Sequence, residues 1–179
     1  MTFDRHVGVV REIGRQFNNR FAASRNDLNA GEESAGNAAM ADALWMRLRE
    51  VRWGDYEVST GKAERLDKLL QDLASRKEAR AMRASQDVWR LLCSGGIRSA
   101  AVPVIPFLVE IIDVSGDNVR CEILDILKSC ALGVDKLESA LGEQLREALI
   151  TARNDLFWLR RKAKGDVAIA VESFYDAAV

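Results

Sequence analysis

Proline and histidine are almost missing from this sequence. Its 179 residues include two prolines and one histidine. Proline interrupts helices and central strands, so its scarcity leaves long regular segments possible. The abundance of leucine, alanine, arginine, glutamate and lysine favours helices, and strands have little to draw on. The composition therefore predicts an all-α fold.

The lack of a second histidine limits the chemistry that this chain could perform. His6 is the only histidine, and we interpret it as a surface or packing residue. Histidine is the most frequent general base and a common zinc ligand. Gly95-Gly96 lacks the lysine and the serine or threonine of a phosphate-binding loop. We therefore expect no catalytic group, no metal and no cofactor, and hence a protein that is not an enzyme.

Cysteine is scarce, and its spacing matches no metal motif. The three cysteines are Cys93, Cys121 and Cys130, and no two of them stand two or three residues apart. An odd number also argues against a disulfide framework. Each lies in an apolar helical stretch, where a reduced cysteine acts as a small hydrophobic residue. We expect a reducing cytoplasm as the setting.

The sequence has neither an excess of one charge nor an apolar run long enough to cross a membrane. It holds 26 basic and 27 acidic side chains, which disfavours binding to a nucleic-acid backbone. The most apolar stretch, Ala100–Val114, is shorter than the roughly twenty residues that a bilayer requires. The N-terminus lacks the pattern of a signal peptide. We expect no membrane partner and no nucleic-acid partner.

Apolar residues recur every three or four positions along most of the chain, as in amphipathic helices. This pattern predicts about seven or eight helices in a single α-helical domain spanning residues 1–179. Spacings typical of capping boxes at Ser75–Glu78 and Asp135–Glu138 mark two helix starts. Five helices are predicted with both ends, at 3–21, 37–53, 76–93, 118–132 and 166–178. A further helix carries the apolar stripe 66–73, and another starts or kinks at Pro103 and Pro106. A long helical pattern continues up to residue 164 and breaks near residue 154. A mobile loop is expected at 24–36.

The middle of the chain contains an internal repeat. A shift of 39 residues superposes the apolar stripe from Leu66 to Leu92 on the stripe from Ile105 to Ala131. A further shift of 40 aligns Ile105 with Leu145, although the match decays in the partner helix. Two helices per unit of about forty residues are typical of HEAT or armadillo repeats. We therefore predict stacked helical hairpins over 61–132, flanked by N-terminal helices at 1–60 and C-terminal helices at 133–179.

Three sequence runs carry a resemblance to a known family. They are DVWRLL at 87–92, AAVPVIPFLVEII at 100–112 and RCEILDIL at 120–127. These runs, within residues 42–132, resemble small bacterial HEAT-like repeat proteins. Such proteins are similar to immunity proteins of polymorphic or contact-dependent toxin systems. The resemblance implies a partner, a cognate protein toxin domain, whose active site the chain would occlude.

Two clusters of aromatic and charged residues are candidate partner-binding sites. Tryptophan, tyrosine and arginine are typical of binding hot spots, and a basic segment beside aromatic residues can bind an acidic surface. Alternatively, Trp53 caps the core, the basic run is a solvated helix end, and Trp45 and Trp89 pack in the core or between repeats. The candidates are Arg49, Arg52, Trp53, Asp55 and Tyr56 in the first cluster, Arg98 in the turn 93–98, and Trp158, Arg160 and Arg161 in the second cluster.

Two other functions stay open at this point. The first is a HEAT-like DNA-binding enzyme that resembles the alkylpurine DNA glycosylases, in which Trp45, Trp53, Asp55 and Tyr56 would face the lesion. The near-neutral charge argues against it, because affinity for DNA requires phosphate neutralisation. The second is a generic helical scaffold or adaptor.

Overall fold

The computed structural model describes residues 44–178. The chain divides into two units, Met1–Leu44 and Trp45–Val179, and the description below concerns the second. The predicted helix 3–21, the predicted loop 24–36 and His6 lie outside the described residues. The expectation that residues 1–179 form a single domain stays a prediction.

The described part of the chain is all-helical and contains no strand, which confirms the predicted fold class. Residues 44–50 form a helix. The elements that follow are the 3₁₀ turn η1 (Trp53–Asp55), α3 (Arg65–Leu73), α4 (Glu78–Cys93), α5 (Ala101–Val114), α6 (Asp117–Gly133), the 3₁₀ turn η2 (Val134–Lys136), α7 (Ser139–Asp155), α8 (Phe157–Lys162) and α9 (Gly165–Ala177).

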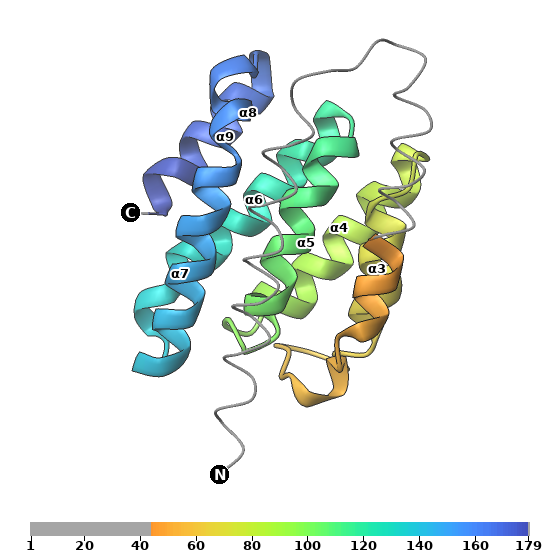
Figure 1. Ribbon diagram of the computed structural model, residues 1–179, viewed down its shortest axis with the longest axis vertical. Helices are drawn as coiled ribbons and strands as arrows, with labels where there is room; N and C mark the ends of the chain where they lie inside the picture. The colour runs from red at the N-terminus through yellow and green to blue at the C-terminus, as the bar shows by residue number, and fades with distance from the viewer. Residues whose placement is uncertain (1–43, 179) are drawn as a thin grey trace. The chain divides into compact units, whose positions relative to one another are not determined.

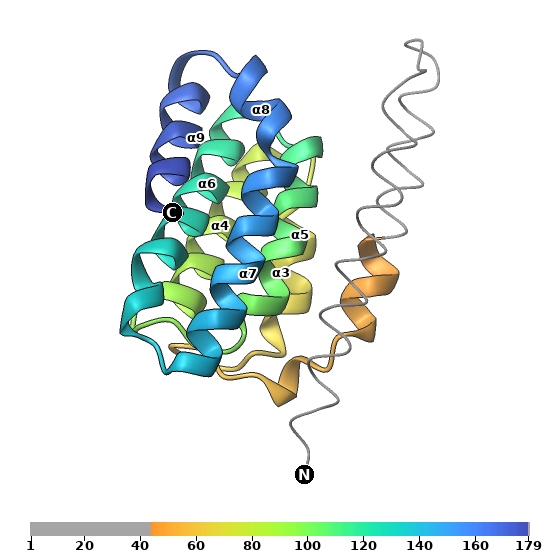
Figure 2. The ribbon, with the colours of Figure 1, turned by 60° about the vertical axis from the view of Figure 1, so that its left-hand side comes forward.

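The helices from α3 onward pack in two layers (Figures 1 and 2). Helices α3, α5 and α7 lie side by side in one layer, and α4, α6 and α9 in the other. The chain crosses between the layers from α3 to α4 and from α5 to α6. The short helix α8 connects α7 with α9. This arrangement is consistent with a bundle of helical repeats.

Contacts between consecutive hairpins join residues whose separation is close to the period of about forty residues found in the sequence. The amide of Asn118 in α6 donates to the carboxylate of Glu78 in α4, 40 residues earlier. The indole of Trp89 in α4 donates to the hydroxyl of Ser129 in α6, again 40 residues away. Helices α4 and α6 therefore run in the same direction, one repeat apart. The third hairpin matches the period poorly because α8 separates α7 from its layer partner α9.

Helix α5 lies at the centre of the apolar core. Ten of its fourteen residues are buried, on all sides of the helix. Pro103 stands in the first turn, where the missing amide hydrogen is not needed, and Pro106 is inside the helix. The prediction that 100–114 is a buried core helix is therefore confirmed. Glu110 and Asp113 are the charged exceptions, and Glu110 forms an ion pair with Arg47 of the helix at 44–50.

Both predicted capping boxes are wrong. Helix α4 begins at Glu78, with Lys77 as its N-cap. The Ser75 hydroxyl accepts the backbone N–H of Lys77 at 3.2 Å. The Glu78 carboxylate accepts a hydrogen bond from Asn118 on α6. In the second motif Asp135 lies inside η2, and α7 begins at Ser139, four residues after Asp135.

The predicted ends of the helices are mostly correct, with one exception. Helix α6 ends at Gly133, and the long C-terminal pattern breaks at Leu156, between α7 and α8. The helix predicted to reach Trp53 instead ends at residue 50, because Trp53 turns into the core as part of η1.

Candidate functional site

The predicted partner-binding residues fall in two groups near opposite ends of the helical layers (Figure 1). One group lies on the helix 44–50 and on the loops that follow it, beside the turn between α4 and α5. The other group lies on α8. The structure therefore does not bring the nine residues into one site. The first group is Arg49, Arg52, Trp53, Asp55, Tyr56 and Arg98, and the second is Trp158, Arg160 and Arg161.

Trp53 packs in the core rather than presenting its ring to a partner. Its side chain is 5% exposed. The indole N–H donates to the backbone carbonyl of Leu48 at 2.9 Å. Its ring centroid lies 6.2 Å from that of Phe107 on α5 and 6.4 Å from that of Tyr56. The core-capping interpretation of Trp53 thus agrees with the structure, and the same burial keeps the indole from facing a DNA lesion.

Hydrogen bonds hold the loop after Trp53 against the end of α4 and the turn between α4 and α5. The amide of Ala100 donates to the carbonyl of Glu57 at 3.0 Å, and the amide of Glu57 donates to the Ser99 hydroxyl at 2.9 Å. Farther along, the amide of Ser59 donates to the carbonyl of Leu91 at 2.7 Å. These bonds place Arg98 beside the predicted cluster, although the two are more than forty residues apart in sequence.

The exposed members of this first group are arginines and one aspartate. Arg49, Arg52, Asp55 and Arg98 are exposed, whereas Tyr56 is half-buried. Burial, and secondarily the charge of Asp55, raise the pKa of the Tyr56 hydroxyl above its ordinary value. Tyr56 is therefore a neutral phenol at neutral pH. The first group can therefore offer a partner a surface of mixed charge on a loop held by hydrogen bonds. The buried Trp53 is not part of that surface.

Arg160, in the second group, is used inside the protein. Its guanidinium makes two hydrogen bonds to Glu172 on α9, at 2.8 and 2.7 Å. It also lies 4.6 Å from the ring centroid of Tyr175, and Arg153 lies 5.1 Å from the same centroid. The Tyr175 hydroxyl donates to the backbone carbonyl of Arg153. These contacts fasten α8 and the end of α7 to α9.

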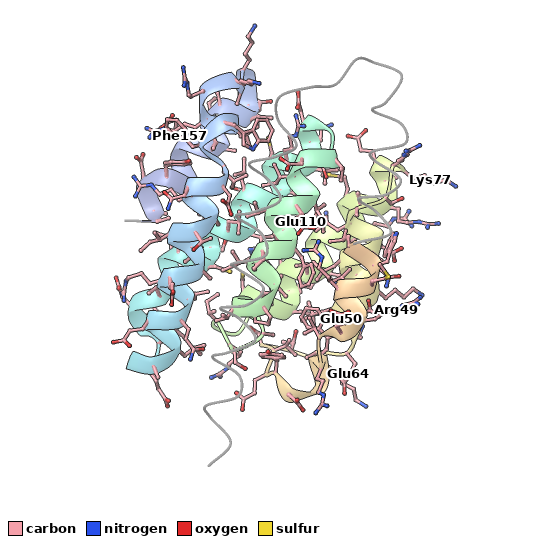
Figure 3. The ribbon with its side chains drawn as sticks, viewed as in Figure 1. Arg49, Glu50, Glu64, Lys77, Glu110 and Phe157 are labelled. Carbon is pink, nitrogen blue, oxygen red and sulfur yellow. The ribbon has the colours of Figure 1, made fainter. Side chains whose placement is uncertain are left out.

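The remainder of α8 forms an exposed aromatic and cationic surface. The Phe157 side chain is 54% exposed, and the Arg161 guanidinium lies 6.0 Å from its ring centroid. Figure 3 shows Phe157 at the edge of the described helices. Within residues 44–178, Arg161, Lys162 and Lys164 are exposed and form no ion pair with a carboxylate. We call Phe157, the half-buried Trp158, Arg161, Lys162 and Lys164 the α8 surface.

A further exposed tryptophan was not among the predicted site residues. Trp89, which the sequence places in the core or between repeats, does bridge α4 and α6 through Ser129 at 3.3 Å. Its side chain is nevertheless 41% exposed, and Leu132, one turn beyond Ser129, is 62% exposed. One feature of the sequence could have indicated this exposed surface. Leu132, just before the glycine that ends α6, is a large apolar residue that lies outside the buried apolar stripe of that helix.

Three further features of the described residues bear on possible sites. Among them, no three His, Cys, Asp or Glu side chains converge on a point where a metal ion could bind. Every buried polar side-chain atom in this part of the chain has a hydrogen-bond partner. No helix between residues 44 and 178 is long and apolar enough to cross a membrane.

Comparison with known proteins adds no relative. The sequence matches no family model, and no curated protein and no solved structure is significantly similar to the chain.

Proposed function

We propose that this chain is a non-enzymatic protein-binding module, an immunity protein that binds a cognate bacterial toxin domain and occludes its active site. The observation that carries the proposal is the α8 surface, where an exposed phenylalanine lies beside the Arg161 guanidinium. Its three cations, Arg161, Lys162 and Lys164, have no carboxylate partner among the described residues. The resemblance of residues 42–132 to small HEAT-like repeat proteins supports the choice of partner.

The composition of the α8 surface suits the centre of a protein interface. Aromatic and arginine side chains dominate binding hot spots, and a ring beside a guanidinium combines apolar contact area with a directional charge. Arg161, Lys162 and Lys164 create a local positive potential on a chain whose net charge is −1. Such a patch accelerates association with an acidic surface and selects against a basic one. We therefore expect the toxin domain to present carboxylates around its active site.

The support beneath α8 favours binding without rearrangement. The Arg160–Glu172 pair and the stacking of two arginines on Tyr175 fix the backbone of α8 to α9. A surface that is rigid before binding loses less conformational entropy in the complex. The structural role of Arg160 thus keeps Phe157 and Arg161 in place.

The test has two stages, because the function and the surface can fail separately. The chain is first expressed with the product of the neighbouring upstream gene, and a stable one-to-one complex together with rescue of cells from that product is the expected result. Absence of both would overturn the immunity function. Tight binding to duplex DNA at low salt would instead favour the DNA-binding alternative, whereas a stable complex that gives no rescue would favour the scaffold.

The second stage asks whether α8 makes the contact. Phe157→Ala and Arg161→Glu should each weaken the complex by about tenfold or more, which corresponds to about 1.4 kcal/mol. Ile169→Ala, on α9 and 71% exposed, is the matched control and should bind as the wild type does. If the complex forms but both α8 variants bind like the control, the function stands and the α8 surface is wrong.

A further inference from the structure

Two cysteines from neighbouring repeats meet where α4 and α6 pack together. Cys130 is fully buried on α6, and Cys93 is half-buried in the last turn of α4. The Cys93 side chain is the first cause of the raised pKa of the Cys130 thiol, which places the two side chains close together. These residues belong to different hairpins, so their contact depends on the stacking of the repeats and not on local sequence.

The register of the two helices supports this contact independently. Ser85 on α4 and Glu122 on α6 are 37 residues apart, and the serine hydroxyl lies 3.3 Å from a carboxylate oxygen. Cys93 and Cys130 have the same separation and lie eight residues, or about two helical turns, farther along each helix. Because α4 and α6 pack together and run in the same direction, equal steps along both helices lead to the same level of their interface. Cys93 and Cys130 therefore lie at one level of the α4–α6 interface.

We propose that Cys93 and Cys130 form a peroxide-reactive site that closes to a reversible disulfide between α4 and α6. The half-buried Cys93 is the thiol that a peroxide can reach. Cys130, which solvent does not reach, is the resolving thiol.

The chemistry proceeds in two balanced steps. The Cys93 thiolate attacks one oxygen of the peroxide, so that an S–O bond forms, the O–O bond breaks and hydroxide leaves for the case of hydrogen peroxide. Cys130 then attacks the sulfur of the sulfenic acid. The S–S bond forms, and the hydroxyl group of Cys93 leaves with the proton of Cys130 as water. The peroxide gains the two electrons that the pair of thiols loses.

The protonation of Cys130 fits the resolving role. The Cys93 side chain close to it and its complete burial hold its pKa well above the ordinary value of 9.0. It therefore remains a thiol until Cys93 has been oxidised. Since the thiolate is the reactive form toward peroxide, Cys130 is protected from direct oxidation in this state.

Cys121, the third cysteine, is an internal control for the oxidation of Cys93 and Cys130. It lies on the same helix as Cys130 and is half-buried. Burial and then the negative charges of Asp166, Asp125, Asp117 and Glu122 raise its pKa above the ordinary value. Carboxylates around a thiol disfavour the thiolate and slow its oxidation. We therefore expect Cys121 to stay reduced while Cys93 and Cys130 react.

The experiment treats the full-length chain with hydrogen peroxide and maps its cysteines by mass spectrometry of non-reduced peptides. The expected product is a monomer that has lost two hydrogen atoms, with Cys93 joined to Cys130 and Cys121 free. Dithiothreitol should restore the original mass. The oxidised protein should also have a higher Tm, because a cross-link between distant residues restricts the unfolded chain.

Substitutions separate the proposed pair from general oxidation. Cys121→Ser should give the same disulfide at the same rate, whereas Cys93→Ser should form no disulfide and should lose its remaining thiols at least tenfold more slowly. Cys130→Ser should accumulate a sulfenic acid at Cys93 that a dimedone probe labels. Circular dichroism checks that each variant folds; if Cys130→Ser does not, the other two variants suffice. A disulfide that involves Cys121, a cross-linked dimer, or sulfinic acid at Cys93 without a disulfide in the wild type would overturn the proposal.

Discussion

The ion pair between Arg47 and Glu110 gives the sharpest test of how the helix at 44–50 is held against α5. The side chains are 31% and 14% exposed, and the Arg47 guanidinium also lies 5.8 Å from the ring centroid of Phe107. Arg47→Met keeps much of the apolar volume and leaves the Glu110 carboxylate without its cation. Removal of one partner from a fully buried pair costs about 3–5 kcal/mol. Because both side chains retain some contact with solvent, we expect a loss of about 2 kcal/mol at neutral pH.

The loss should depend on pH in a defined direction. Burial raises the pKa of Glu110 above its ordinary value of 4.5, although the hydrogen bond and the charge of Arg47 oppose this rise. Without Arg47 the pKa rises further. A raised folded-state pKa means that Glu110 favours folding below pH 4.5 and that this contribution is lost as the pH increases through the folded-state value. The deficit of the variant should therefore shrink in acid, by up to about 1.4 kcal/mol for each unit of additional pKa rise.

Urea unfolding at about pH 7 and about pH 5, followed by tryptophan fluorescence, measures both effects. Arg49→Met is the matched control, because Arg49 is exposed on the same helix, and it should change the free energy of unfolding by less than about 0.5 kcal/mol. The double variant Arg47→Met/Glu110→Leu should recover most of the loss, since no buried charge remains. The reasoning is refuted if Arg47→Met is as stable as the control or if its deficit is the same at both pH values.

Two further substitutions test the packing. In Gly133→Ala, the new methyl would lie 2.6 Å from Cγ1 of the buried Ile97. The free energy of unfolding, measured by thermal unfolding, should therefore fall by about 1–3 kcal/mol. Gly142→Ala is the control, because its methyl meets no atom closer than 3.5 Å, and it should be neutral or stabilising by up to about 1 kcal/mol. Trp53→Phe removes the N–H that satisfies the carbonyl of Leu48 and should cost about 1–3 kcal/mol by urea unfolding, and an unchanged midpoint would show that this bond contributes nothing.

Most helices could be predicted from the sequence because their signals are local. The largely apolar stretch of α5, the glycine at the end of α6 and the break between α7 and α8 each depend on residues within one or two turns. The predicted repeat also follows from the spacing of apolar residues, and the packing of the described helices is consistent with it. The helices form as predicted because a helix of ordinary length is stabilised mainly by the burial of its apolar stripe.

The failures share a physical cause, which is competition from residues distant in sequence. The predicted capping glutamate, Glu78, instead accepts a hydrogen bond from Asn118, which the sequence places 40 residues away. Trp53 follows a helix whose end could have been exposed. Its ring is instead buried against Phe107 on α5, which is 54 residues away in sequence. Periodicity indicates which face of a helix is apolar, but it does not indicate whether another helix covers that face. Trp89 is an example, because its side chain stays 41% exposed.

The basic run of α8 shows how the same limit affects the search for function. Arg160 and Arg161 are adjacent and chemically identical, so the sequence assigns both to one patch. Successive helical residues point about 100° apart. Arg160 accordingly hydrogen-bonds to Glu172 and stacks on the Tyr175 ring, while Arg161 faces solvent beside Phe157. A charge reversal at Arg160 would disturb the support of α8 and its surface together. Of the two arginines, only Arg161 allows a substitution that tests recognition without disturbing folding. The residues of a basic segment should therefore be assigned to a partner individually.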